Sequence, residues 1–135
     1  MVAKWSSAEI LTRITNAANI GILRATEQVL STAVKAIQNP PKTGHVYKRR
    51  GVAHQASAPG EAPATDTGRL VQSGRTEYDR KKVLGRVVFS TNYAASLEYG
   101  TQTIEPRPFA RPALASNKDF IMQAVKEEIL NALSN

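Results

Sequence analysis

The side chains that could carry out chemistry in this sequence are few. His45 and His54 are the only two histidines, and the chain of 135 residues contains no cysteine. Both histidines fall in a segment rich in Gly, Pro, Ala and Ser, and no further ligand lies at a spacing that would converge with them on a metal ion. A Ser-His-Asp site has little support without a well-placed histidine, and the Gly-Lys-Ser/Thr ending of a phosphate-binding loop is absent. The sequence therefore predicts a protein that is not an enzyme and needs no metal or cofactor.

Basic side chains are the most prominent chemical feature of the chain. Its 18 Lys and Arg outnumber its 11 Asp and Glu, which gives a formal charge of +7. Two basic clusters are predicted at loop tips, one of Lys48, Arg49 and Arg50 and the other of Arg80, Lys81 and Lys82. Such clusters bind phosphates or the acidic face of another protein, or they are simply solvated turns. Composition alone leaves these three readings open.

Neither a secretion signal nor a membrane span is expected. The N-terminal residues lack the uninterrupted apolar stretch of a signal peptide, and no window approaches the ~18 apolar residues of a spanning helix. The absence of cysteine fits a protein made in a reducing cytoplasm.

A long amphipathic helix is predicted over residues 6–38. Ser6 and Glu9 form a capping box, and the proline pair at residues 40–41 ends the helix. Apolar residues recur along one stripe at Ile14, Ala18, Ile22, Ala25, Val29, Ala33 and Ile37. The helix would be roughly 50 Å long at 1.5 Å per residue, which exceeds the core that one small domain can build. We therefore expect either another subunit to cover part of the stripe or a bend at residues 19–21.

Residues 42–68 form a predicted basic arm with little apolar surface to bury. A short hairpin around residues 49–51 is expected within it. Because an arm this long in a small domain is either functional or disordered, we expect it to become ordered only on assembly.

The C-terminal half predicts a small sheet and further helices. A short helix capped by Asp66 or Thr67 precedes two strands, at residues 75–80 and 83–91, joined by a tight basic turn. An amphipathic helix over residues 116–135 is expected to begin at a box of Ser116 and Asp119. Its expected apolar residues are Ile121, Val125, Ile129 and Leu133, with Phe120 and Ala124 beside them. The predicted fold is a single α+β domain.

Residues 93–114, YAASLEYGTQTIEPRPFARPAL, read as a rigid corner. Gly100 can adopt the left-handed conformation that ends a helical turn. Glu98 is placed to hold the loop or a neighbour's arginine. Pro106, Pro108 and Pro112 stiffen the segment that is expected to place Phe109 in an apolar site. Pro112 is expected in the first turn of the final helix, where a proline is tolerated.

This corner and residues 58–73 together resemble the neck, or head-tail joining and tail-completion, family of long-tailed double-stranded DNA phages. The matching features follow the family's order along the chain. They are Pro-Gly-x-x-Pro, then Thr67-Gly68-Arg69-Leu70 with Ser73, then Tyr93-Ala94, then Glu98-Tyr99-Gly100-Thr101, and finally Pro108-Phe109-x-Arg111-Pro112-Ala113.

The resemblance implies a non-enzymatic α+β subunit that is made in the bacterial host cytoplasm and forms a ring in the virion neck. The implied partners are further copies of the chain, head-completion or connector proteins on one side, and tail-terminator or tail-tube proteins on the other. Six copies are favoured because such tails have sixfold symmetry, and twelve are the alternative. Genomic DNA would pass through the channel without sequence-specific binding, and no membrane is involved.

The resemblance also implies a set of interface or structural-motif residues. These are Gly68, Arg69, Leu70, Tyr93, Glu98, Gly100, Thr101, Arg107, Pro108, Phe109, Arg111 and Pro112. Among them, Glu98, Arg107 and Arg111 are expected to contact neighbours, and the basic tips are expected to face acidic patches on adjoining rings. The alternative class of function, suggested by the charge, is a basic DNA-binding module.

Overall fold

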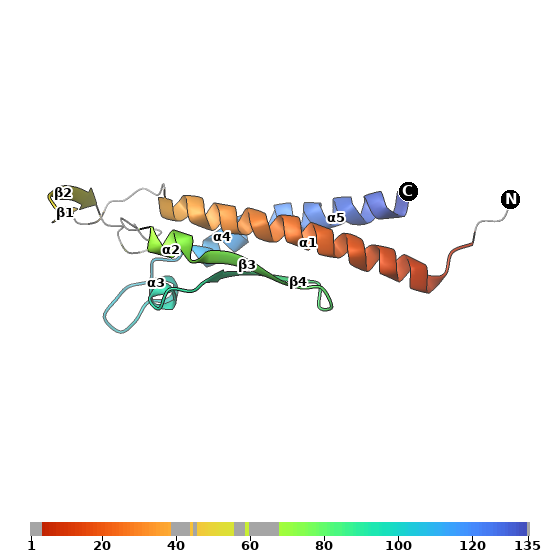
Figure 1. Cartoon of the computed structure of the whole chain (residues 1–135), viewed down its shortest axis with the longest axis horizontal. Coiled ribbons are helices and arrows are strands. Elements are labelled where there is room, and N and C mark those ends of the chain that lie inside the picture. Colours follow the sequence, from red (N-terminus) through yellow and green to blue (C-terminus); the bar gives the residue numbers. More distant parts are fainter. Residues whose placement is uncertain (1–3, 39–43, 45, 56–58, 60–67, 135) are drawn as a thin grey trace.

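The computed structural model describes residues 4–38, 44, 46–55, 59 and 68–134, and its elements lie along one long helix (Figure 1). The order of elements is α1 (Ser7–Gln38), β1 (Val46–Arg49), β2 (Val52–Gln55), α2 (Arg69–Gln72), β3 (Gly74–Asp79), β4 (Leu84–Phe89), α3 (Ala94–Tyr99), α4 (Ala110–Ser116) and α5 (Lys118–Ser134). The expected α+β fold is confirmed. The described residues form two two-stranded antiparallel sheets, β1–β2 and β3–β4.

Helix α1 begins where its capping sequence predicts. The Ser6 hydroxyl oxygen accepts a hydrogen bond from the Glu9 backbone N–H at 3.1 Å, which satisfies one of the free donors of the first turn. The buried side of the helix includes Ala25, Val29, Ala33 and Ile37 from the predicted stripe. The other stripe residues, Ile14, Ala18 and Ile22, are half-buried.

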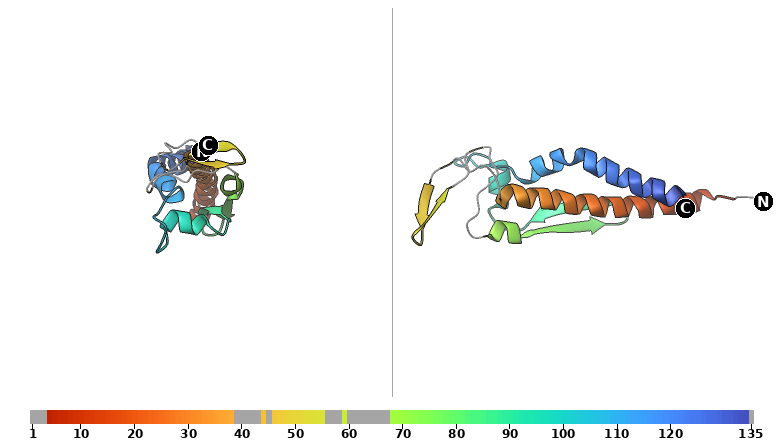
Figure 2. Two further views of the ribbon diagram at one scale, coloured as in Figure 1. Left: turned by 90° about the vertical axis from the view of Figure 1, so that its left-hand side faces the viewer. Right: turned by 90° about the horizontal axis from the view of Figure 1, so that it is seen from above.

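Helix α1 continues without interruption through residues 19–21, where the sequence allowed a bend. Gly21 instead permits close packing against α5, which runs antiparallel to α1 (Figure 2). A Cβ atom added to Gly21 would lie 2.6 Å from the Val125 Cα. The glycine is therefore a contact point between the two helices.

The β3–β4 hairpin packs on a different side of α1 from α5 (Figure 2). Its register runs from Gly74 opposite Phe89 to Asp79 opposite Leu84. The two predicted strands are confirmed, the first shifted by one residue and the second shorter than expected. At its basic turn, the Asp79 carboxylate accepts hydrogen bonds from the backbone N–H groups of Lys81 and Lys82 at 3.0 and 3.2 Å. The hairpin is also tied to α1, since the Thr76 and Tyr78 hydroxyls donate to Glu27 at 3.0 and 2.8 Å.

The β1–β2 hairpin projects beyond the C-terminal end of α1 (Figure 1). Its two-residue turn is made by Arg50 and Gly51, with φ of 51° and 81°, as the primed hairpin turns require. All four residues of β1 are exposed. The expected hairpin is thus confirmed, although the strands bury none of those side chains against the body.

Three details of the C-terminal half differ from expectation. The helix predicted over residues 116–135 is divided into α4 and α5 at Asn117. Ser116 does not cap α5, because its hydroxyl donates to the Ala113 carbonyl at the end of α4. Pro112 accordingly lies in the first turn of α4 rather than of the final helix. The division has a tertiary cause, since the buried Asn117 amide donates to the Thr32 hydroxyl and to the Ala113 carbonyl, both at 2.8 Å.

The apolar face of α5 agrees with the predicted one except at two residues. Ile121, Val125 and Ile129 are half-buried as expected, but Phe120 and Leu133 are 40% and 41% exposed. Ala124 is the fully buried residue of the helix, because small residues let α5 approach α1 closely. At α2 the residue in the cap position is Gly68, with φ of 72°, and the expected caps Asp66 and Thr67 lie outside the described residues.

The core lies near the C-terminal end of α1, where the short helices converge. Ile37, Leu70, Ala94 and Phe109 form one buried cluster, and Val29, Ala33 and Ala113 form a second. Phe89 joins the two clusters and meets Phe109 edge-to-face with ring centroids 4.9 Å apart. No helix in the described part of the chain is long and apolar enough to cross a membrane.

Candidate functional site

The corner predicted from sequence is built around Gly100, which ends α3. Its φ of 76° with ψ of 175° is the positive-φ backbone expected of this glycine, in a region that other residues rarely enter. A Cβ atom there would lie 2.9 Å from both the Ile104 carbonyl oxygen and the Pro106 Cδ. Position 100 therefore requires glycine for two reasons: the backbone has a positive φ, and there is no room for a Cβ atom.

A closed turn follows Gly100 and projects from the body (Figure 1). The Thr101 hydroxyl oxygen accepts hydrogen bonds from the backbone N–H groups of Thr103 and Ile104 at 3.3 and 3.1 Å. The Thr101 N–H donates in turn to the Ile104 carbonyl at 2.8 Å, and the Arg107 N–H donates to the Leu97 carbonyl at 2.6 Å. The turn is held in one shape although its residues 101–106 are all exposed.

Glu98 is the central polar residue of the corner and is only 5% exposed. One carboxylate oxygen accepts hydrogen bonds from the backbone N–H groups of Phe109 and Ala110 at 2.8 and 3.0 Å. The other accepts from the Arg111 N–H at 2.8 Å. These are the free donors at the start of α4, so Glu98 acts as a cap delivered from a different helix.

The charge of Glu98 is stabilised inside the subunit. Burial raises the pKa of its carboxyl, but the backbone N–H groups of Phe109, Ala110 and Arg111 and the Arg111 guanidinium outweigh this, so that the pKa lies below its usual value. The carboxylate therefore remains ionised at neutral pH and holds the loop, which is one of its two expected roles.

Arg111 completes the same network from α4. Its Nε donates to the Glu98 carboxylate at 3.0 Å and a terminal nitrogen donates to the Glu98 carbonyl at 2.9 Å. The guanidinium also lies 4.6 Å from the centroid of the Tyr99 ring, a favourable cation–π arrangement. Arg111 binds within its own subunit, while 57% of its side chain and the neighbouring Tyr99 ring remain open to solvent.

The remaining motif residues divide between core and surface. Phe109 and Leu70 are 2% and 1% exposed in the same core cluster, which places Phe109 in an apolar site as predicted. Pro108 and Arg107 are half-buried, and the Arg107 Nε is a buried donor with no hydrogen-bond partner. The others, Arg69, Tyr93, Thr101 and Pro112, are exposed, and Gly68 is half-buried at the start of α2.

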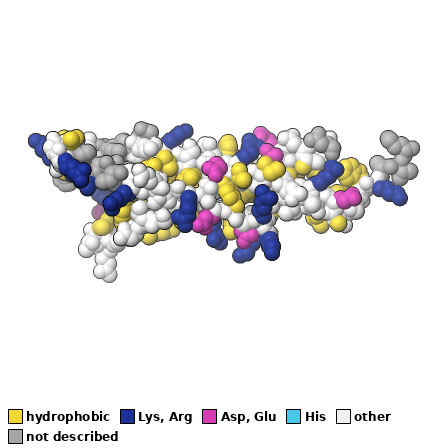
Figure 3. Space-filling model, in the orientation of Figure 1, with side chains coloured by type: hydrophobic (Ala, Val, Ile, Leu, Met, Phe, Trp, Pro, Cys, Tyr) yellow, Lys and Arg dark blue, Asp and Glu magenta, His cyan; other side chains and the backbone are white. Residues whose placement is uncertain are grey.

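The two basic tips lie at separate places on the molecule. The first, Lys48–Arg50, is at the end of the projecting β1–β2 hairpin, and the second, Arg80–Lys82, is at the β3–β4 turn alongside α1 (Figures 1 and 3). Of the histidines, His54 is on β2 and His45 lies outside the described residues. Within the described ranges, no group of three or more His, Asp or Glu could hold a metal ion.

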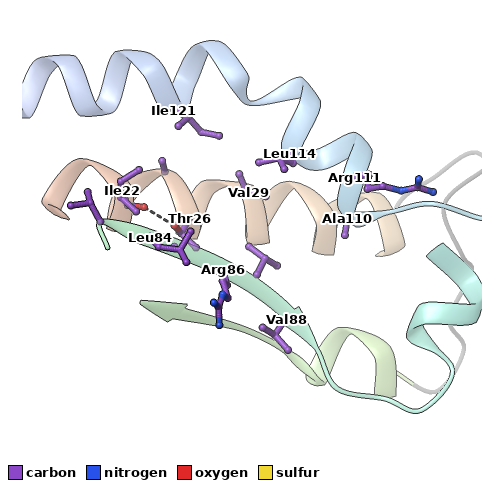
Figure 4. A pocket seen from close by; sticks show the side chains of 14 residues that line it. Ile22, Thr26, Val29, Leu84, Arg86, Val88, Ala110, Arg111, Leu114 and Ile121 are labelled. Carbon is purple, nitrogen blue, oxygen red and sulfur yellow. Dashed lines mark hydrogen bonds between the residues drawn. The ribbon is translucent and has the colours of Figure 1, made fainter. Parts of the chain in front are cut away.

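A groove that sequence reasoning missed runs between β4 and the α4–α5 joint (Figure 4). It has a volume of about 470 Å³, and its floor is α1. Its apolar side chains come from α1, from β4 and from the consecutive helices α4 and α5. The helical and strand patterns of the sequence do not distinguish these side chains from core residues. The sequence therefore carries no signal that could have revealed it.

Comparison of the whole chain with protein-family models, with curated proteins and with solved structures finds no match in any of the three. The resemblance to phage neck proteins thus rests on the ordered sequence motifs, several of which meet in the corner between α3 and α4.

Proposed function

We propose that this chain is a structural subunit of a phage neck, where copies of it form a ring around the DNA channel and complete the junction of head and tail. The observation that carries the proposal is the corner between α3 and α4. There Gly100, Glu98 and Arg111, which belong to the family-like motifs, interlock into a rigid joint that contains no catalytic arrangement. Such a joint suits a protein whose task is to present surfaces in a fixed geometry.

The partners in this proposal are those of a neck ring. Six copies are favoured over twelve, with head-completion or connector proteins and tail-terminator or tail-tube proteins above and below. Because Glu98 and Arg111 are bonded to each other, we assign them to positioning the corner. The exposed Tyr99 ring and the projecting turn are then the parts of the corner offered to neighbours.

The test of this function is the joining of heads to tails in a phage that carries a Gly100→Val substitution. A β-branched side chain is strained at the positive φ of this position and collides with two close neighbours, at a cost of at least ~1–3 kcal/mol. The chain after residue 100 is therefore expected to leave the corner in a different direction. We expect electron micrographs to show heads and tails in normal numbers but few joined particles. Gly100→Ala also places a Cβ against Ile104 and Pro106, and we expect an intermediate defect from it.

A matched control is Gly51→Ala, because Gly51 has φ of 81° but no atom within 4 Å of an added Cβ. It places a side chain at a positive φ without crowding and leaves the corner untouched, so we expect heads and tails to join normally. A normal yield of joined virions from Gly100→Val would show that this glycine does not position the joint.

The alternative, a basic DNA-binding module, is supported by the charge of +7. The two basic tips lie apart, and acidic side chains stand among the basic ones along the body between them (Figure 3). A duplex-binding surface instead gathers its cations into one basic patch or stripe. A mobility-shift titration with duplex DNA distinguishes the two functions. A DNA-binding module should bind with a steep dependence on salt, whereas we expect a ring subunit to bind only weakly at all salt concentrations.

A further inference from the structure

The groove along β4 is an apolar recess with basic margins. Ile22 and Val29 of α1 form its floor, Leu84 and Val88 lie on the β4 side, and Leu114 and Ile121 lie on the α4–α5 side (Figure 4). Thr26 also lines it, but its hydroxyl is satisfied by the Ile22 carbonyl at 2.6 Å. Arg86 and Arg111 also line it, but the Arg111 guanidinium is bonded to Glu98. The recess therefore favours an apolar group with a negative charge near Arg86.

The wall formed by β4 also offers backbone hydrogen-bonding groups. Six consecutive residues, 83–88, line the groove, and within the described residues β4 pairs only with β3. Its second edge is thus open on the groove side. Open strand edges are surfaces on which a segment of another chain can pair.

The projecting turn at residues 101–106 is a counterpart to this groove. Ile104 is 43% exposed although the turn around it is held by the Thr101 hydrogen bonds. Glu105 follows it directly and is exposed. A large apolar side chain on a pre-organised turn is suited to binding, since little further conformational entropy is lost on docking.

We infer that the turn around Ile104 and Glu105 of one copy of this chain docks into the β4 groove of a second copy. Ile104 contacts the apolar floor, and Glu105 lies opposite Arg86. Arg86 is available for such a pair because Glu77, its neighbour across the β3–β4 sheet, is bound instead to Arg75 at 3.0 Å. The turn and the groove are different surfaces, so the contact between copies is head to tail. Repeated contacts of this kind form a closed ring when the rotation that relates neighbouring subunits divides evenly into a full turn.

The accessible surface supports a second copy as the occupant. The chain exposes 9277 Å², whereas a compact monomer of 14.7 kDa is expected to expose about 6,900 Å². The exposed apolar side chains next to the groove include Leu114 and Met122. Stable interfaces bury on the order of 1,200–2,000 Å² in total, so this chain has surface to spare for one.

Disulfide trapping tests the contact directly, because the chain has no cysteine of its own. The turn after α3 and the start of β4 lie at opposite ends of the β3–β4 hairpin (Figure 1), so Ile104→Cys and Leu84→Cys cannot pair within one chain. After oxidation of the assembled protein, we expect the double variant to give a ladder of covalent oligomers beyond the dimer. Each single variant should give dimers at most. A double variant without a ladder overturns the inference.

A charge exchange provides the second test. Glu105→Arg and Arg86→Glu should each weaken self-association about tenfold through like-charge repulsion, and the combined variant should restore it, as measured by sedimentation. Lys126→Glu changes the charge equally on exposed α5 and should have no effect. Failure of the combined variant to recover overturns the pairing.

This inference rests on the proposed ring, but the two can fail separately. If phage carrying the double-cysteine chain join heads to tails normally and yet show no ladder in their virions, the contact is wrong and the proposed function stands. If the chain is absent from virions but the purified protein forms the ladder, the contact stands and the proposed neck function is wrong.

Discussion

At the scale of single residues, Glu98 shows how one carboxylate can organise a joint. It satisfies three backbone donors at the start of α4 and binds Arg111, so that α3 and α4 share one polar centre. Buried donors that lose their acceptor are costly. We expect Glu98→Gln to lower the free energy of unfolding by about 1–3 kcal/mol, measured by urea denaturation. Glu105→Gln, an exposed carboxylate in the same corner, is the control and should change little.

The lowered pKa of Glu98 also predicts a pH dependence. Because the folded state holds this carboxyl at a lower pKa than the unfolded state does, the unfolded state binds more protons between the two values. The stabilisation is complete above the ordinary carboxyl pKa of about 4.3 and is lost as pH falls through the lowered folded value. Wild-type stability should therefore fall more steeply on acidification than that of Glu98→Gln. Parallel curves would show that the carboxylate is not stabilised by folding.

At the scale of elements, the pairing of α1 with α5 depends on backbone proximity at Gly21. Alanine is intrinsically better in a helix than glycine by about 1 kcal/mol, so an exposed glycine-to-alanine change would stabilise α1. At Gly21 the added carbon meets the Val125 backbone, and overpacking typically costs about 1–3 kcal/mol. We expect Gly21→Ala to lower the thermal midpoint, whereas Asn16→Ala on the exposed side of α1 should raise it slightly. A higher midpoint for Gly21→Ala would contradict the close contact.

At the scale of the whole molecule, the protein is a thin body with two basic loop tips. One tip is held by a hydrogen bond to α1, and the other projects from the body (Figure 1). The Arg80–Lys82 turn is held on α1, where the Asn19 amide donates to the Arg80 carbonyl at 3.1 Å. The β1–β2 tip projects from the body with exposed strands, and isolated two-stranded hairpins are marginally stable. We expect trypsin to cut the free subunit first within the basic arm at Lys48–Arg50, well before the second tip. In assembled protein the first site should be protected, and equal cleavage rates in the free and assembled forms would contradict ordering on assembly.

The sequence by itself determined the local features of this protein. The capping serine, the positive-φ glycines at positions 51 and 100, the two hairpins and the proline-rich approach to Phe109 all follow from rules that operate over a few residues. The helical stripe of α1 is equally local, because its period is a property of the backbone. These features suffice for the α+β class and for the existence of the corner.

Only the tertiary structure decided which groups meet. The role of Glu98 depends on free N–H groups 11 to 13 positions away, and the division of the last helix depends on Asn117 reaching Thr32, 85 positions away. The sequence suggested a bend near Gly21 or a second subunit over the stripe, whereas the structure places α5 against this glycine. The groove along β4 exists because four separate elements leave it unfilled. Such features are set by packing between distant segments, which no periodicity within one segment encodes.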